Sequence, residues 1–166
     1  MNIVLHQPEI PHNTGAIGRT CLMTGARLHL IRPFGFYLDE KALRRAGMDY
    51  WPKIDVTEYD CFQDFIEKNP SANIYLAESG IGITYTDVEY KPGDFIIFGS
   101  ETKGLPQSLL EQYKHRIINI PMIGEERSLN LSVTAGIVLY EALRQQGFPG
   151  LTGELLPKKT NPPVEE

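Results

Sequence analysis

Short apolar runs alternate with segments of helical periodicity along this chain, and this alternation is the strongest constraint on its fold. The run at 2–6 (NIVLH) is followed by a helical segment from Asn13 to about Thr24, and then by the run at 27–31 (RLHLI). A strand, a helix and a second strand with short connections form a βαβ unit, whose two strands are parallel. We therefore predict an α/β fold with a mostly parallel sheet and helices on both faces.

The same alternation continues to the end of the chain. Further strands are expected at 73–79, 94–100 and 115–120, and further helices at 38–47, through Phe62, Phe65 and Ile66, at 106–113 and at 132–146. Beyond Gly147 the chain becomes rich in Gly and Pro. We expect one domain over residues 1–150 and a loose tail over 151–166.

Local signals predict where several of these helices begin and end. Asn13 and Ser132 are the expected N-caps of the first and last helices, and Gly25 is the expected C-terminal stop of the first. Asp60 and Gln63 have the spacing of a capping box.

Charge is unevenly distributed along the sequence. The net charge of -5 disfavours a protein that coats nucleic acid indiscriminately. Residues 1–53 nevertheless carry seven Lys and Arg against four acids, a net of +3, whereas residues 54–116 carry five against eleven, a net of -6. Two interpretations remain open: a basic region for one localised anionic partner, or solvated surface charges.

Cysteine usage and hydropathy indicate the compartment. Cys21 and Cys61 have neither CxxC spacing nor the spacing of metal ligands, which suits a reducing cytoplasm. No apolar run approaches the roughly 20 residues that span a bilayer, and the first residues do not resemble a signal peptide. We expect a cytoplasmic protein that uses neither a membrane nor a metal ion.

Polar and glycine-rich segments follow three of the predicted strands. These segments are 8–19 (PEIPHNTGAIGR), 99–106 (GSETKGLP) and 121–132 (PMIGEERSLNLS). Parallel sheets bind ligands in the crevice at the carboxyl ends of their strands. The three loops are therefore expected to converge on one site.

Two of these loops resemble nucleotide-binding motifs only in part. Gly99 and Gly104 have phosphate-loop spacing, but Leu105 and Pro106 stand where a Lys and a Ser or Thr are required, and the first loop lacks GxGxxG. A nucleoside triphosphatase or a dinucleotide enzyme is therefore not supported. Glu101 is either a ligand group or a carboxylate that stabilises its own loop.

Polar side chains in the other two loops suggest a ligand as well. Asn13 and Arg19 are six residues apart near the start of one helix, so both are expected to address the crevice. An arginine near a helix N-terminus gains nothing from the helix dipole, which favours an external anionic partner. Ser128 and Asn130 add polar groups where a single cap would suffice.

Taken together, the segments PEIPHNTGAIGRTC, FIIFGSETKGLP and IPMIGEERSLNLSVTAGIVLYEALRQ resemble the three ordered motifs of the SpoU branch of the SPOUT RNA 2'-O-methyltransferases. Within that branch they are most similar to the TrmL-like tRNA (cytidine/uridine-34-2'-O)-methyltransferases. The resemblance covers about residues 2–147. Ala16, where the family often has Asn, and the acidic pair Glu125 and Glu126 depart from the pattern.

The resemblance implies a fold, a cofactor and a site. It implies a C-terminal trefoil knot that holds S-adenosylmethionine, with Ala77, Gly99, Ile120 and Ser128 as cofactor-binding residues. It implies catalytic roles for Arg19, Asn13, Glu101 and Asn130, and no metal.

The resemblance also implies a partner and a substrate. The expected substrate is the anticodon loop of tRNA, methylated on the ribose of its wobble nucleotide by a homodimer. Two alternatives remain: a SpoU-type enzyme that acts on another tRNA position or on rRNA, and an RNA-binding module without activity.

Overall fold

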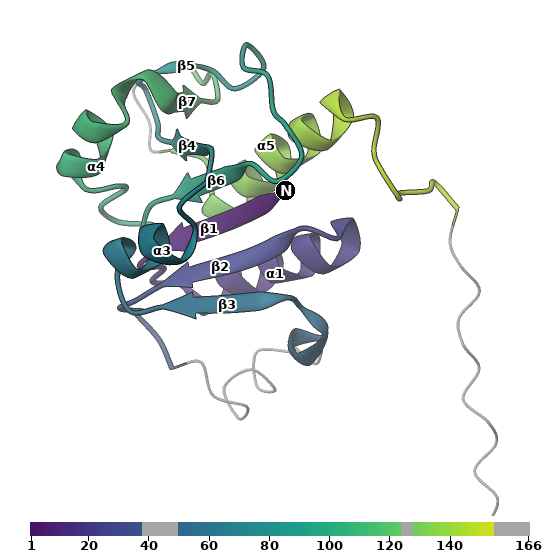
Figure 1. Cartoon of the computed structure of the whole chain (residues 1–166), viewed down its shortest axis with the longest axis horizontal. Helices are drawn as coiled ribbons and strands as arrows, with labels where there is room; N and C mark the ends of the chain where they lie inside the picture. Colours follow the sequence, from purple (N-terminus) through teal and green to yellow (C-terminus); the bar gives the residue numbers. More distant parts are fainter. Residues whose placement is uncertain (38–49, 124–127, 155–166) are drawn as a thin grey trace, which may run out of the picture.

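In the computed structural model, which describes residues 1–37, 50–123 and 128–154, a parallel sheet forms the centre of the molecule (Figure 1). Its seven described strands lie in the order β3-β2-β1-β6-β4-β7-β5, and every neighbouring pair is parallel. The strands are β1 (Asn2–His6), β2 (Arg27–Ile31), β3 (Val56–Tyr59), β4 (Ile74–Ala77), β5 (Ile83–Thr84), β6 (Phe95–Phe98) and β7 (Ile117–Asn119). The predicted parallel α/β fold is confirmed.

Helices cover both faces of this sheet, as predicted (Figure 1). Because side chains alternate along a strand, Ile3 and Leu5 of β1 pack toward α1 and α5, whereas Val4 packs toward α3 and α4. The described helices are α1 (Pro11–Thr24), α3 (Phe62–Lys68), α4 (Gln107–Gln112) and α5 (Leu131–Gln145), with the short 3-10 helices η1 (Trp51–Lys53) and η2 (Lys114–Arg116). None of the helices in these described segments is long and apolar enough to cross a membrane.

Some predicted elements differ from the structure. The strands β3 and β5 were not predicted, because two of the four residues of β3 are exposed and β5 has only two residues. The predicted helix at 38–47 lies outside the described residues. Most of the predicted tail does too, although Leu151 packs against the core; the domain boundary at residue 150 therefore stays a prediction.

Two predicted N-caps are wrong. The first helix begins at Pro11, and its N-cap residue Ile10 makes no side-chain hydrogen bond, so Asn13 lies inside the helix. Asn130 caps α5 instead of Ser132, because its side-chain oxygen accepts hydrogen bonds from the N–H groups of Ser132 and Val133.

The other two helix-end signals have opposite outcomes. The predicted stop at Gly25 is confirmed by its left-handed φ of 71°. The predicted capping box of Asp60 and Gln63 is wrong, because Cys61 occupies the N-cap position and the Gln63 amide donates to Glu67.

The order of the strands predicts a crevice at the carboxyl ends of the strands. From β1 the chain moves outward to β2 and β3. The remaining strands lie on the other side of β1, in the spatial order β6, β4, β7 and β5. Such a reversal leaves a ligand-sized gap at the carboxyl ends of the strands on either side of it. The implied trefoil knot stays a prediction, because residues 124–127 of the connection to α5 lie outside the described chain.

Candidate functional site

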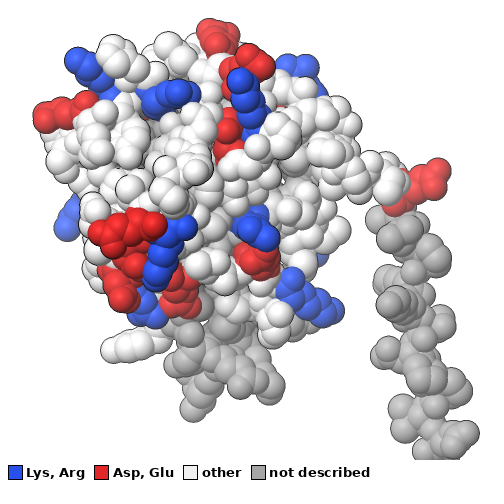
Figure 2. Space-filling view, in the orientation of Figure 1, with Lys and Arg blue, Asp and Glu red and all other residues white. Residues whose placement is uncertain are grey.

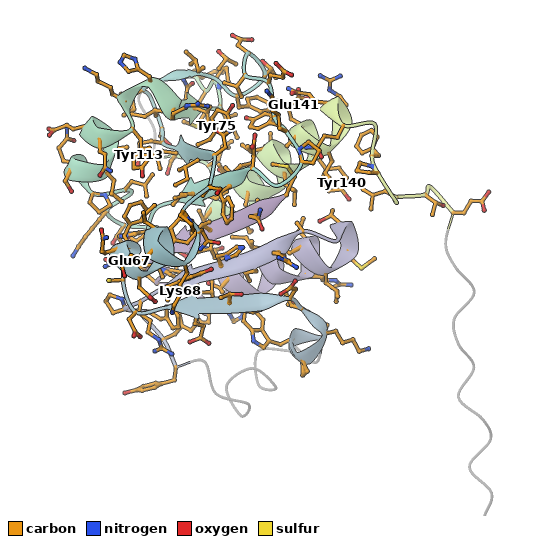
Figure 3. The ribbon with its side chains drawn as sticks, viewed as in Figure 1. Glu67, Lys68, Tyr75, Tyr113, Tyr140 and Glu141 are labelled. Atoms are coloured by element: carbon orange, nitrogen blue, oxygen red, sulfur yellow. The ribbon has the colours of Figure 1, made fainter. Side chains whose placement is uncertain are left out.

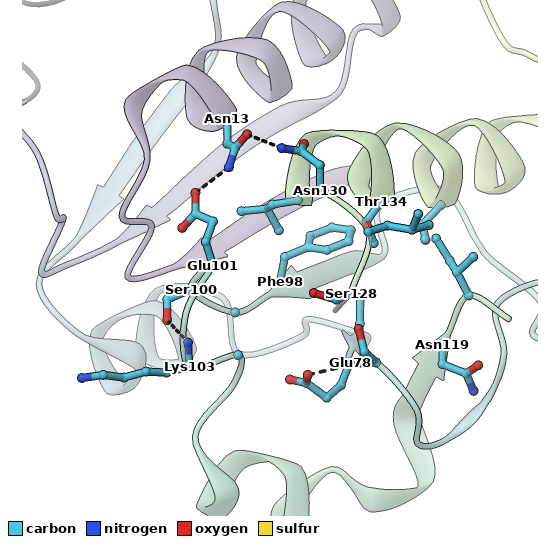
Figure 4. A pocket seen from close by; sticks show the side chains of 18 of the residues that line it. Asn13, Glu78, Phe98, Ser100, Glu101, Lys103, Asn119, Ser128, Asn130 and Thr134 are labelled. Carbon is cyan, nitrogen blue, oxygen red and sulfur yellow. Dashed lines mark hydrogen bonds between the residues drawn. The ribbon is translucent and has the colours of Figure 1, made fainter. Parts of the chain in front are cut away.

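A cavity of about 450 Å³ opens at the carboxyl ends of β4, β6 and β7 (Figure 4). Its walls come from the loops after β1, β6 and β7, the three loops that the sequence predicts to converge, and from the first turns of α5. The loop after β4 contributes Glu78 and Ser79, which the sequence analysis did not select. The predicted convergence is therefore confirmed, with a fourth loop added.

All four predicted cofactor-binding residues line this cavity. Ala77 ends β4, Gly99 follows β6, Ile120 follows β7, and Ser128 precedes α5. Apolar side chains complete the walls between them, namely those of Phe98, Ile118, Leu131 and Val138. The cavity therefore combines apolar surface with a few polar groups, as small-molecule sites usually do.

Gly99 is required by the loop that it begins. A Cβ atom at this position would collide with the backbone of Gly104 and Leu105. The collision follows from the loop closing on itself, since Ser100 and Gly104 exchange backbone hydrogen bonds of 3.2 and 2.9 Å. Gly99 was predicted as a cofactor-binding residue, and the structure shows that the backbone of its own loop also requires a glycine there.

Three of the four predicted catalytic residues form one hydrogen-bonded chain beside the cavity (Figure 4). The side-chain amide of Asn13 donates to Glu101 at 3.0 Å, and its oxygen accepts from the amide of Asn130 at 2.9 Å. The side-chain oxygen of Asn130 caps α5. Residues from the loops after β1 and β6 are thereby tied to the start of α5.

A pair of glutamates locks the loops after β1 and β6 together. The Glu101 carboxylate accepts from the backbone N–H groups of Glu9 and Ile10 at 2.8 and 3.2 Å. In return, the Glu9 carboxylate accepts from the Thr102 N–H at 2.9 Å and from its hydroxyl at 2.7 Å. These contacts favour a positioning role for Glu101.

The structure does not bring Arg19 to the cavity of its own chain. Arg19 is exposed on α1, outside the cavity lining, and its guanidinium carbon lies 5.8 Å from the ring centroid of Tyr50. The expectation that Asn13 and Arg19 face the same crevice is therefore wrong within one chain. A role for Arg19 stays a prediction that requires a second chain.

Glu78 and Lys103 are charged residues of the cavity lining that were not predicted from the sequence. The Glu78 carboxylate accepts from the backbone N–H groups of Leu105 at 2.9 Å and Ser79 at 3.2 Å. Its position in the sequence could have identified Glu78 as a site residue. It directly follows a buried strand, at the same end of the sheet as two glycine-rich loops.

Cysteines and possible metal ligands are the remaining reactive groups to consider. Cys21 is buried in the core, and burial raises the pKa of its thiol to about 12, so the thiolate is scarce at neutral pH. Within residues 1–37, 50–123 and 128–154, no group of three or more His, Cys, Asp or Glu could hold a metal ion.

The chain is similar to known proteins along most of its length. The chain is 47% identical to the tRNA (cytidine(34)-2'-O)-methyltransferase of Escherichia coli (strain K12) over 152 residues, which cover 90% of this chain and 96% of the relative. A solved structure described as giving "structural insights into the 2-OH methylation of C/U34 on tRNA" aligns with a TM-score of 0.82 at 41% identity, covering 88% of this chain and 95% of that one.

A second solved structure carries a cofactor. It is an AdoMet-bound rRNA methyltransferase from Sinorhizobium meliloti, with a TM-score of 0.74 and 26% identity, and the match covers 86% of this chain and 55% of that one. Finally, residues 1–140 match the SpoU rRNA methylase family. These matches show that the chain belongs to the SpoU methylase family.

Proposed function

We propose that this protein uses S-adenosylmethionine to methylate the 2'-hydroxyl of the wobble nucleotide, cytidine or uridine 34, in the anticodon loop of tRNA. The observation that carries the proposal is the cavity at the carboxyl edge of the sheet, bordered by the hydrogen-bonded chain of Glu101, Asn13 and Asn130. The relatives that act on position 34 support the choice of substrate.

The residues of the cavity suit S-adenosylmethionine. Its volume of about 450 Å³ falls within the range of roughly 300–1,000 Å³ that is usual for such ligands. Ala77, Gly99, Ile120 and Ser128 would hold the cofactor between apolar walls. When bound, it supplies a methyl group carried on a positively charged sulfur.

The protein's own side chains then act on the RNA. A ribose 2'-hydroxyl is a weak nucleophile, so the site must stabilise negative charge as its proton leaves. Arginine stays protonated in proteins, and we assign Arg19 to stabilise the developing alkoxide or to hold an adjacent phosphate. The amides of Asn13 and Asn130 orient the ribose, while Glu101 holds the loops.

The position of Arg19 and the character of the surface support the proposal of a homodimer. Figure 2 shows basic and acidic side chains interspersed on the viewed face, without a continuous basic surface for RNA. Large apolar side chains are exposed on the two neighbouring helices α1 and α5: Met23 is 67% exposed, and Val133 and Tyr140 (Figure 3) are each 49% exposed. Pairing through these helices would bury apolar surface and bring a partner's Arg19 toward the cavity.

The proposal also places the enzyme in the cytoplasm, with its tRNA substrate. Cys21 and Cys61 are both free thiols, as is usual for proteins of a reducing compartment.

A single-atom change in the RNA tests the proposed reaction. Anticodon stem-loops that carry either ribose or 2'-deoxyribose at position 34 are incubated with the protein and radiolabelled S-adenosylmethionine. We expect methylation of the ribose substrate and none of the deoxy substrate, because the acceptor oxygen is missing. Equal labelling of both would show that another nucleotide is methylated, and binding without labelling of either would identify a non-catalytic RNA-binding module.

A further inference from the structure

The Glu78 carboxylate occupies a central position in the cavity wall. It follows β4, which lies between β6 and β7 in the sheet, so it stands between two of the loops that form the cavity. A Cβ atom on Gly104 would come within 2.8 Å of this carboxylate, which shows how tightly the glycine-rich loop is packed against it. Two backbone N–H groups hold the carboxylate in place.

Among the described residues, Glu78 is also a cavity carboxylate with acceptor positions left for a ligand. Glu101 accepts three hydrogen bonds from neighbouring protein groups, and the exposed Lys103 side chain points away from the cavity (Figure 4). Among the described residues, Glu78 takes part in no ion pair. A carboxylate has about four acceptor positions, and two backbone donors leave some of them unused.

The substrate and product forms of the proposed cofactor differ in charge. Transfer of the methyl group to the 2'-oxygen breaks its bond to sulfur, and the electron pair of that bond stays on sulfur. The sulfonium thereby becomes an uncharged thioether, while the rest of the molecule is unchanged. The 2'-hydroxyl loses its proton, which is released to the solvent. A negative side chain in a cavity attracts the charged form more strongly, because Coulomb interactions are larger there than in water.

We infer that Glu78 makes the pocket select S-adenosylmethionine, with its positively charged sulfonium, over its product S-adenosylhomocysteine, whose sulfur is uncharged. This inference rests on the proposed function. Its consequence is easier product exchange after each turnover, since loss of the positive charge removes part of the attraction to the pocket.

Calorimetric titration of the full chain tests the inference without relying on turnover. For the wild type, we expect S-adenosylmethionine to bind about tenfold more tightly than S-adenosylhomocysteine, which corresponds to about 1.4 kcal/mol. Glu78→Gln keeps the shape of the side chain and removes its charge, so this preference should fall to less than about twofold, mainly through weaker binding of S-adenosylmethionine. The matched control is Glu67→Gln on the exposed face of α3, which should leave both affinities unchanged.

A ligand change covers the case in which Glu78→Gln does not fold. An analogue with a protonated amine in place of the sulfonium retains the positive charge, and it should bind the wild type within about threefold of S-adenosylmethionine. Equal wild-type affinities for the charged and uncharged forms would overturn the inference, as would an equal loss of both in Glu78→Gln. Failure of the wild type to bind either form would instead overturn the proposed function.

Discussion

Asn130 has two separate hydrogen-bonding functions in a single side chain. Its oxygen accepts from the N–H groups of Ser132 at 2.8 Å and Val133 at 3.4 Å, which caps α5, while its amide donates to Asn13. The polar residues that crowd the start of this helix therefore have different contacts. Ser128 lines the cavity, Asn130 caps the helix and reaches the site, and the hydroxyl of Ser132 donates to Asn130.

Two substitutions separate the functions of Asn130. Asn130→Ala removes both and should lower the free energy of unfolding by about 1–2 kcal/mol. Asn130→Asp retains a capping oxygen but loses the donor to Asn13, so it should cost less stability while still lowering kcat/KM. Urea unfolding and methyl-transfer assays measure the two effects. Wild-type kcat/KM in Asn130→Asp would show that the bridge to Asn13 is dispensable.

His29 makes stability depend on pH. Its ring is buried between the Tyr59 hydroxyl at 2.9 Å and the Asn2 amide oxygen at 3.1 Å, and burial lowers its pKa to about 4. An unfolded histidine has a pKa of about 6.5, so between these values the unfolded state binds more protons. Stability should therefore fall as the pH falls from about 6.5 to 4, by up to about 3 kcal/mol.

Urea unfolding from pH 7.5 to 4.5 measures this dependence. His29→Gln should flatten the slope, whereas the control His115→Gln, at an exposed position, should retain it. An unchanged slope in His29→Gln would assign the dependence to other groups, of which His6 is the first candidate, because burial lowers its pKa too.

At the scale of elements, buried strands and the convergence of loops were predictable from the sequence. The outermost strands, and the directions in which helix side chains point, were not. The strands β1 and β6 contain continuous apolar runs. Parallel strands place the loops that follow them at the same end of the sheet, the carboxyl end. By contrast, β3 (VTEY) is an outermost strand of the sheet, and its two central residues, Thr57 and Glu58, are polar and exposed, so its apolar signal is weak.

Helix geometry explains the error on Arg19. Six residues rotate a helix by about 240°, which turns Arg19 away from the direction of Asn13. The contacts between loops, such as those of Glu9 with Thr102 and of Glu78 with Leu105, join residues far apart in sequence. No local pattern predicts which donor a given carboxylate will meet.

The loop at 99–104 should tolerate no side chain at its first position. Gly99→Ala places a Cβ atom against the backbone of Gly104 and Leu105, so the loop must open. We expect loss of S-adenosylmethionine binding by calorimetry, together with a lower melting temperature. The matched control is Gly153→Ala, where an added Cβ meets no atom within 4 Å. Normal binding and stability in Gly99→Ala would contradict the described loop.

At the scale of the whole molecule, the cavity and Arg19 belong to different parts of one chain's surface. A homodimer in which each Arg19 serves the partner's cavity predicts complementation between two inactive variants. Arg19→Ala has an intact cavity, and Asn130→Ala has an intact Arg19. Mixed after unfolding and refolding together, they should regain about a quarter of wild-type activity, because half of the dimers then hold one complete site.

Sedimentation of the same samples provides the control for assembly. The wild type and both variants should sediment as dimers of the 18.7 kDa chain. A monomeric and fully active wild type would contradict the proposed dimer. If Arg19→Ala is inactive and the mixed dimers recover no activity, Arg19 acts on the cavity of its own chain. An Arg19→Ala variant that is active before mixing would place Arg19 outside the site.

Mapping of 2'-O-methyl groups in an unbiased RNA pool tests the central claim most directly. Total tRNA and rRNA from cells that lack this protein are incubated with the purified chain and S-adenosylmethionine, and each ribose is then read at nucleotide resolution. We predict new methylation at position 34 of a subset of tRNAs and at no other position. New methylation confined to another tRNA position or to rRNA would contradict the proposed substrate while leaving the methyltransferase chemistry intact, and no new methylation would contradict the proposed activity itself.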